Sequence, residues 1–318
     1  SLLSRHDDSA EAMRAVRYLR RREILRIAMG DALNLLGVQQ VCTGLATVDE
    51  CTIGAALALA EREEITAKER EEAAGIREIP EEEPENPLLT EIAVIAMGRL
   101  GGAENGFGSD ADVMFVHRPV EGAGEEEAQS QANRIVNRLM QLIKQPVRPA
   151  IRAERPLEVD ADLRPEGKQG AMVRSLDSYR AYYERWAETW EFQALLRARP
   201  IAGSEELGRA FIELIDPYRY PREFTAEQAQ QVRRMKARVE HERMPHGADR
   251  TRQLKLGRGG LSDVEWLVQL IQLQHAHEVQ GLRTTSTLEA LNAAVEANLV
   301  AAEDAEVPRD AWQLATKI

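Results

Sequence analysis

A glycine-rich stretch that joins two short apolar runs limits the fold more than any other feature of this sequence. It reads MGRLGGAENGFGSDADVMFVH, residues 97–117. The runs EIAVIAM (residues 91–97) and ADVMFVH (residues 111–117) lack a helical period and are bounded by turn residues, which predicts two adjacent strands. A helical pattern covers residues 125–145, and ERPLEVDADLRP (residues 154–165) alternates like a third strand. The predicted core is a small mixed β-sheet.

Helical patterns flank this sheet on both sides in sequence. Residues 8–70 have apolar positions near helical spacing and begin with a plausible N-cap at Asp8 and Ser9. The charge-rich segment 61–87 ends in three prolines, so we expect helix to stop near Ile79 and a linker to follow. Beyond Ser175 the sequence is mainly helical. These patterns predict an α+β fold in three parts: residues 1–87 (helical region and acidic, proline-rich linker), 88–203 (sheet domain) and 204–318 (helical bundle).

Composition excludes several classes of function. The 318 residues are 43% hydrophobic, enough for a packed core, and the net charge of −12 opposes electrostatic binding of nucleic acid. Cys42 and Cys51 form no Cys-x-x-Cys motif, which indicates a reducing compartment. The apolar runs are short for a membrane span, and the first residues lack the pattern of a signal peptide. We therefore expect a cytoplasmic protein that acts on a protein or a small molecule.

The glycine-rich stretch matches neither common nucleotide motif, because it lacks G-x-x-x-x-G-K-[ST] and does not fit G-x-G-x-x-G. It instead places a turn at Gly98 and a pair at Gly101 and Gly102 directly after a strand. Glycines let the backbone approach phosphate oxygens and point N–H groups at an anion. The stretch therefore suits a polyphosphate.

Two aspartates open the second predicted strand. Asp110 and Asp112 are two residues apart and point to one face of a strand, an oxygen-rich arrangement that suits Mg²⁺. The third predicted strand offers Glu158, Asp160 and Asp162 on one face. A glycine turn, an Asp-x-Asp and a distant acid are typical of two-metal phosphoryl or nucleotidyl transfer. The alternative is a turn of glycines with aspartates that cap a loop.

Longer blocks narrow the assignment. The segment AVIAMGRLGGAENGFGSDADVMFVH resembles the signature of the DNA polymerase β nucleotidyltransferase superfamily. Five blocks between Gly98 and Trp266 together resemble the bacterial glutamine synthetase adenylyltransferase family. Members of this family add AMP to glutamine synthetase and also remove the AMP. The blocks are GRLGG, GSDADVMF, VDADLRPEGKQGAMV, ETWEFQALLRAR and KLGRGGLSDVEW.

The resemblance implies one of two homologous halves. The blocks TWEFQALLRAR and GGLSDVEW, with Asp263 before Glu265, resemble the C-terminal, AMP-transferring half. The alternatives are the half that removes AMP by phosphorolysis, a small-molecule nucleotidyltransferase, and a non-catalytic regulatory half. The family implies glutamine synthetase as the protein substrate, with a PII signal protein and glutamine as effectors, and neither a nucleic acid nor a membrane as partner.

The resemblance also implies roles for individual residues. Asp160 matches the third metal carboxylate, so Asp110, Asp112 and Asp160 would hold two Mg²⁺ and act in catalysis, with Asp160 accepting the proton of the target tyrosine. Asp162 stands where the family usually has an arginine. The residues expected at the phosphates of ATP are Gly98, Arg99, Gly101, Gly102, Ser109 and Arg164.

Other positions in the blocks give narrower expectations. Arg197 and Arg199 are two residues apart in a predicted helix, so at most one should face the site. Ser262 and Glu265 have the spacing of a capping box at a helix start. Lys255 precedes a glycine turn and either approaches the nucleotide or belongs to a plain loop-to-helix joint.

Overall fold

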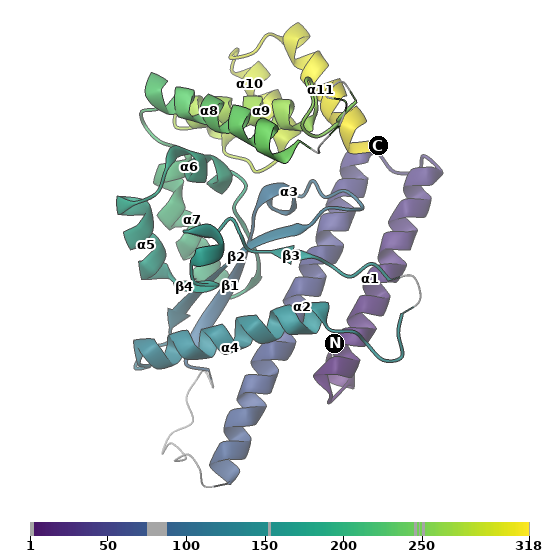
Figure 1. The fold of residues 1–318 in the computed structure, drawn as a ribbon, viewed down its shortest axis with the longest axis vertical. Coiled ribbons are helices and arrows are strands. Elements are labelled where there is room, and N and C mark those ends of the chain that lie inside the picture. The colour runs from purple at the N-terminus through teal and green to yellow at the C-terminus, as the bar shows by residue number, and fades with distance from the viewer. Residues whose placement is uncertain are drawn as a thin grey trace.

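A computed structural model describes residues 3–74, 88–151, 154–244, 247, 249 and 252–317 of the chain. It has an α+β fold in which a small mixed sheet lies between helical layers (Figure 1). This agrees with the fold class predicted from sequence. The predicted linker up to Pro87 falls largely in residues 75–87, which lie outside the described residues, so the predicted domain boundary there stays a prediction.

The sheet is built around the two strands predicted from the apolar runs. Its strands are β1 (Thr90–Ala96), β2 (Ala111–Pro119), β3 (Val159–Asp160), β4 (Val173–Ser175) and β5 (Arg199–Gly203). β1 pairs antiparallel with both β2 and β5, whereas β3 and β4 run parallel to β2. The order is β3-β2-β1-β5, with β4 also on β2. The central strands β1 and β2 are buried almost throughout, which explains their continuous apolar sequence.

Alternating residues of the central strands face two separate cores. Val94 and Phe115 face the layer of α1, α2 and α4, whereas Ile95 and Met114 face α5, α6 and α7. The period-2 pattern of each strand is hidden in the sequence because both of its faces are apolar. The two cores therefore pack on opposite faces of β1 and β2 and support the strand that begins beside Asp110.

The first layer consists of α1 (Ser9–Ala32), α2 (Val38–Ala73) and α4 (Glu125–Lys144), preceded by a 3-10 turn at Leu3–Arg5. The predicted N-cap is confirmed, because the Asp8 side chain accepts a hydrogen bond from Ala10 N–H. The single long helical pattern is two antiparallel helices that break near Gly37 (Figure 1). α2 crosses the whole molecule and packs on α1, α4 and β5.

One described helical segment, Val38–Glu71 in α2, has the length and apolar composition of a membrane span. Sequence inspection expected none. Half of its most apolar window is buried inside the protein, against neighbouring helices and the sheet. A helix that is packed inside a protein core can have the same length and apolar composition as a membrane span. The packing of α2 therefore accounts for its apolar composition.

Glu61 on α2 leads to a pH-dependent prediction. Burial raises the pKa of its carboxyl from 4.5 to about 7. Between these values the folded protein keeps a proton that the unfolded chain has lost, so stability falls as pH rises through this window. Glu61→Gln removes the titration. We expect the variant to gain up to about 3 kcal/mol over the parent near pH 8, and the gain to fade below about pH 5.

Urea unfolding at both pH values measures this gain. Glu69→Gln, at an exposed position of the same helix, is the matched control and should show no pH-dependent gain. A gain for Glu61→Gln that is the same at both pH values would show that the side chain contributes by something other than its charge.

The second layer consists of α5 (Leu176–Arg185), α6 (Thr189–Leu195) and α7 (Glu205–Arg219). α7 packs Leu207, Phe211 and Ile215 into the core beneath β1 and β2. The part of the chain after residue 203 therefore begins with a helix that belongs to the sheet's own core. The boundary predicted between residues 203 and 204 stays a prediction. The sequence did not predict β5, a short strand that is only half-buried.

The C-terminal helices form a third group above the sheet (Figure 1). They are α8 (Ala226–Arg243), α9 (Leu261–His275), α10 (Thr287–Glu296) and α11 (Ala302–Lys317), with a 3-10 turn at Gln280–Leu282. Cys42 of α2 packs with Leu261 of α9 and Trp312 of α11. The upper end of α2 therefore joins this group to the first layer.

The third predicted strand is much shorter than expected. Only Val159–Asp160 pairs as a strand, and the chain then turns through Gly167–Gln169 before β4. Asp160 ends the strand because its Oδ1 accepts a hydrogen bond from Asp162 N–H at 2.7 Å. The segments β3 and β4 each run parallel to β2, and because β3 ends at Asp160, Asp160 and Asp162 do not share a strand face.

Candidate active site

The glycine turn, residues 98–102, lies directly under the side chain of Asp112. It follows β1 and forms the short helix α3 (Gly98–Gly101). Gly98 has a φ of +52°, which favours glycine, and a Cβ there would lie 2.3 Å from Asp112 Oδ2. Met97 N–H donates to the carbonyl of Asp112 at 2.8 Å. The turn and the acid are therefore in direct contact.

The next two glycines admit an arginine from the other side of the sheet. A Cβ on Gly101 would lie 1.8 Å from the carbonyl oxygen of Arg197, and one on Gly102 would lie 2.6 Å from Arg197 Nη1. A side chain at either position would push the turn away from Arg197. The glycines thus serve close packing as well as the approach of a ligand.

Gly98→Ala should destabilise the protein more than the backbone strain alone explains. An alanine at positive φ costs about 1–2 kcal/mol. The new methyl group must also displace the carboxylate of Asp112. We expect a total loss of about 2–3 kcal/mol in the free energy of unfolding, measured by urea denaturation.

Gly122→Ala is the matched control. Gly122 has a φ of +81°, and no atom lies within 4 Å of the position that a methyl group would take, so the variant carries the strain without the clash. The difference between the two variants isolates the contact with Asp112. Equal losses would show that the carboxylate moves aside freely.

Asp112 and Asp160 lie side by side on neighbouring parallel strands. They are register partners in the pairing of β2 with β3, and Ala111 N–H donates to the carbonyl of Glu158 at 2.8 Å. Both acids are half-buried, whereas Asp110, just before β2, is exposed. Of the three predicted acids, Asp112 and Asp160 therefore lie closest together.

The environment of Asp112 opposes its negative charge. Burial raises its pKa to about 6, and the charges of Asp160 and Asp110 act in the same direction. The positive charges of Lys255 and Arg243 act against this rise. Asp112 is therefore an acid whose ionised form lacks full compensation from its surroundings.

A magnesium ion fits the donor set of these acids. Their oxygens are the hard ligands that Mg²⁺ prefers, and a divalent cation would relieve the repulsion that raises the pKa of Asp112. Among the described residues, no three or more His, Cys, Asp or Glu side chains form a group arranged to hold a metal. The site of Asp110, Asp112 and Asp160 stays a prediction.

A cavity of about 370 Å³ lies beside Asp110 and contains two of the residues expected at phosphates, Arg99 and Ser109. Arg99 Nε donates to the carbonyl of Glu104 at 2.7 Å, while its Nη2 is inaccessible to solvent and has no hydrogen-bond partner among the described residues. Ser109 Oγ accepts from Gly106 N–H at 2.9 Å and so shapes the loop. Arg99 thus lines the cavity while one of its donors is buried without a hydrogen-bond partner among the described residues.

Arg164 is buried in the turn that follows β3. Its guanidinium donates to the carbonyls of Ala161, Gly170 and Lys168, at 2.7, 3.0 and 3.3 Å. These bonds close the turn, and the expected role at the phosphates stays a prediction. Asp162 forms ion pairs with Lys168 at 3.2 Å and with Arg164 at 3.6 Å.

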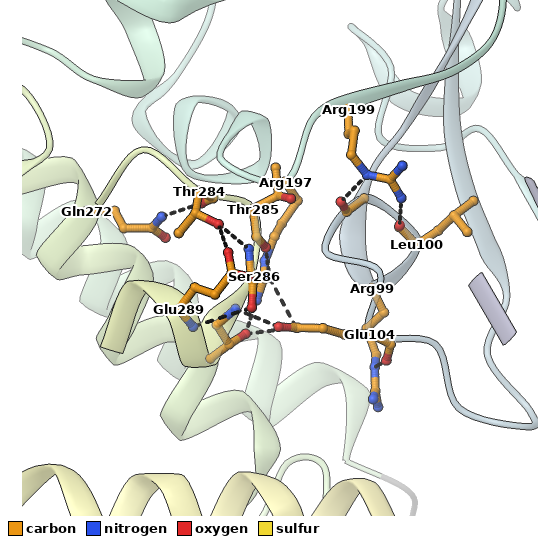
Figure 2. Close-up of polar contacts among 12 residues, drawn as sticks. Arg99, Leu100, Glu104, Arg197, Arg199, Gln272, Thr284, Thr285, Ser286 and Glu289 are labelled. Atoms are coloured by element: carbon orange, nitrogen blue, oxygen red, sulfur yellow. Dashed lines mark hydrogen bonds and ion pairs between the residues drawn. The ribbon is translucent and has the colours of Figure 1, made fainter. Parts of the chain in front are cut away.

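The premise that Arg197 and Arg199 share one helix, from which at most one was expected to face the site, is wrong. It assumed a continuous helix, but α6 ends at Leu195, and Arg199 begins β5. Arg199 donates to the carbonyls of Gly101 and Leu100, both at 3.0 Å (Figure 2). The two arginines therefore both contact the glycine turn.

Glu104 and Arg197 join the glycine turn to the C-terminal helices. Both are buried and form an ion pair at 3.1 Å. Glu104 also accepts from the N–H and the hydroxyl of Thr287, and Arg197 donates to Thr285 O and Thr287 Oγ1. Figure 2 shows this network between the turn and the start of α10. We call this contact between sheet and C-terminal helices the seam.

Sequence reasoning missed Glu104. The only available signal was an acidic residue inside an otherwise glycine-rich loop, next to a block that contains arginines. The neighbouring Asn105 anchors the same loop to α2, because its Nδ2 donates to Asp49 Oδ2 at 3.0 Å. The loop that leads to the Asp-x-Asp is thus fixed from two sides.

The predicted capping box at Ser262 and Glu265 is absent. α9 begins at Leu261, after Gly260, and no side chain caps it. Asp263 Oδ2 instead accepts from Gly259 N–H at 2.7 Å. Glu265 Oε1 is inaccessible to solvent and has no hydrogen-bond partner among the described residues.

Comparison with known proteins gives consistent matches. The model of the glutamate-ammonia ligase adenylyltransferase family matches residues 1–214, and that of GlnD PII-uridylyltransferase matches residues 233–318. The bifunctional glutamine synthetase adenylyltransferase/adenylyl-removing enzyme of Nocardia farcinica is 48% identical over 99% of this chain and 29% of its own length. The enzyme of the same name from Streptomyces avermitilis is 48% identical, over 99% and 31%. The chain thus spans about three tenths of these relatives.

Proposed function

The chain belongs to the glutamate-ammonia ligase adenylyltransferase family, and from this premise we propose that it transfers AMP from ATP to a tyrosine hydroxyl of glutamine synthetase. The names of the relatives support both the reaction and the protein substrate. The relatives are named for both adding and removing AMP, so the direction is part of the proposal. The blocks TWEFQALLRAR and GGLSDVEW, with Asp263 before Glu265, favour the adding direction.

The acids at the start of β2 and in β3 would hold the metal. Asp110, Asp112 and Asp160 would bind Mg²⁺, which supplies positive charge to the phosphates of ATP when bound. The glycine turn offers backbone N–H groups at a position where no side chain intervenes. Arg99 adds a guanidinium with an unsatisfied donor on the wall of the adjoining cavity.

The transfer is an in-line displacement. The tyrosine oxygen bonds to the α-phosphorus of ATP, the bond to the β-phosphate oxygen breaks, and pyrophosphate leaves with that electron pair. We assign the phenolic proton to Asp160. Oδ1 of Asp160 already accepts from Asp162 N–H, which fixes the carboxylate and leaves Oδ2 for the hydroxyl.

One observation carries this proposal. The carboxylate of Asp112 lies over a glycine turn that has no room for a side chain, beside Asp160 and near a cavity that Arg99, Lys255 and Lys317 help to line. A purely structural turn would have no need for a half-buried acid whose burial and neighbouring acids raise its pKa to about 6. A site that binds a metal with a polyphosphate needs both features.

Two parallel incubations test the direction of the reaction. In the first, the chain receives Mg²⁺, ATP and unmodified glutamine synthetase. In the second, it receives Mg²⁺, inorganic phosphate and adenylylated synthetase, without ATP. We expect mass spectrometry to find AMP on a synthetase tyrosine in the first and no loss of AMP in the second. The reverse pattern would assign the AMP-removing direction.

A further inference from the structure

Two loops lead into the strands that carry the acids, and they meet at one edge of the sheet. The first loop, residues 105–109, leads to Asp110 and β2, and the second, residues 154–158, leads into β3. Because β2 and β3 are parallel, both loops reach the sheet at the same edge. The guanidinium of Arg155 lies against the first loop, since a Cβ on Gly108 would lie 3.1 Å from its Nη1. The two loops therefore form one surface next to the exposed Asp110.

Helix α1 borders this surface. The chain between α4 and β3 runs beside α1 (Figure 1), and Arg20 Nη1 donates to the carbonyl of Arg155 at 2.8 Å. Near the end of α1, Asp31 lines the 370 Å³ cavity together with Phe107 of the first loop. The stretch of α1 from Arg20 to Asp31 therefore passes both loops.

The border between α1 and the loops combines large apolar side chains with arginines. Leu25 is 57% exposed and Phe107 is 46% exposed. Arg21 lies one helical turn before Leu25 and so on the same face of α1. The side chains of Arg21 and Arg155 form no hydrogen bond or ion pair with any residue that the structure describes. We call Arg21, Leu25, Phe107 and Arg155 the rim.

Other arginines of α1 differ from those of the rim because each has an acid as its partner. Arg17 pairs with Glu154 at 2.6 Å and Arg20 with Asp49 at 3.0 Å, and these four side chains are largely buried. The rim thus has unpaired positive charge in a chain of net charge −12. Aromatic residues and arginine are enriched where proteins bind each other, and complementary charge selects the partner. The rim therefore fits a protein surface that is acidic and partly apolar.

We propose that the rim docks the protein substrate, with an acidic segment beside the acceptor tyrosine lying across it. The apolar part of this segment packs on Leu25 and Phe107, and its carboxylates face Arg21 and Arg155. This inference rests on the proposed function, in which a tyrosine of a folded protein reaches the acids. A side chain that enters at this edge of the sheet brings its own protein surface against the two loops. Helix α1 thereby takes a direct part in recognising the substrate.

Steady-state AMP transfer with unmodified glutamine synthetase as the varied substrate tests the rim. The double variant Arg21→Gln with Arg155→Gln should raise the KM for the synthetase by about tenfold, because two charge contacts with the partner are lost. Its kcat and its KM for ATP should remain parental, and its KM for the synthetase should depend less on salt than that of the parent. Leu25→Ser should raise the same KM by about fivefold, because it truncates an apolar contact.

Arg70→Gln with Arg209→Gln is the matched control. Arg70 in the last turn of α2 and Arg209 in α7 are exposed, and the control loses the same charge as the rim variant. It should keep the parental KM for the synthetase. An unchanged KM in the rim variant, or a rise that the control shares, would overturn the inference and leave the proposed function standing.

Direct binding separates the rim from the reaction. If the parent chain transfers no AMP, binding of glutamine synthetase to the immobilised chain provides the same comparison. Weaker binding in the rim variant than in the control would then uphold the rim and refute the proposed function. A parent chain that neither transfers AMP nor binds the synthetase would refute both.

Discussion

Asp112→Asn is expected to reduce AMP transfer to glutamine synthetase by at least about a hundredfold, since it removes a charged ligand from the site where transition-state charge is stabilised. The fold should remain intact. Burial and the charges of Asp160 and Asp110 raise the pKa of Asp112, so its ionised form is unfavourable in the folded protein. The neutral amide should therefore keep or raise the melting temperature at neutral pH.

The activity measurement is transfer of label from α-labelled ATP to the synthetase, with circular dichroism to follow unfolding. Asp304→Asn changes an exposed aspartate in the first turn of α11 and serves as the control for a lost charge. It should transfer AMP like the parent. An Asp112→Asn variant that transfers AMP at the parental rate would remove Asp112 from the mechanism.

Arg197→Met is expected to cause the largest loss of stability, about 3–5 kcal/mol in the free energy of unfolding. The arginine is buried, and its loss leaves the buried carboxylate of Glu104 with an uncompensated charge. Only the contacts of Glu104 with Thr287 remain. Because the same network joins the glycine turn to α10, we also expect weaker ATP binding in the folded fraction.

Two further variants separate this effect from a general cost of losing an arginine. Arg134→Met breaks the contact of an exposed arginine with Glu64, and such surface pairs contribute at most about 1 kcal/mol. The double variant Arg197→Met with Glu104→Gln removes both charges and should lose less stability than Arg197→Met alone. A double variant as unstable as the sum of its single changes would show that the two residues act independently.

The sequence predicted the central elements of the fold because their patterns are local. The apolar runs became β1 and β2, and the amphipathic segment after them became α4. β4 and β5 were missed, since each is short and mostly half-buried, and neither interrupts the helical pattern around it strongly. The third strand was predicted too long because the alternation of its acids continues past the turn that Asp160 makes.

For the site, the sequence predicted that the glycine turn and the Asp-x-Asp act together on one polyphosphate, and the structure places Asp112 over Gly98. Spacing did not predict the roles of Glu104 and Arg197, because they meet across 93 residues of sequence, and their buried contact depends on how the C-terminal helices pack. The wrong premise that Arg199 shares a helix with Arg197 also arose because local spacing does not show where a helix ends. A helix boundary shifted by a few residues turned two side chains from opposite faces toward one turn.

The paired acids and the glycine turn are the groups that we expect to direct the transfer of the adenylyl group. The most direct test incubates the chain, Mg²⁺ and unmodified glutamine synthetase with ATP labelled either at the α- or at the γ-phosphate. We predict that α-label appears on a synthetase tyrosine while γ-label appears only in free pyrophosphate. Transfer of γ-label to the synthetase, or label on the synthetase from neither ATP, would contradict this mechanism.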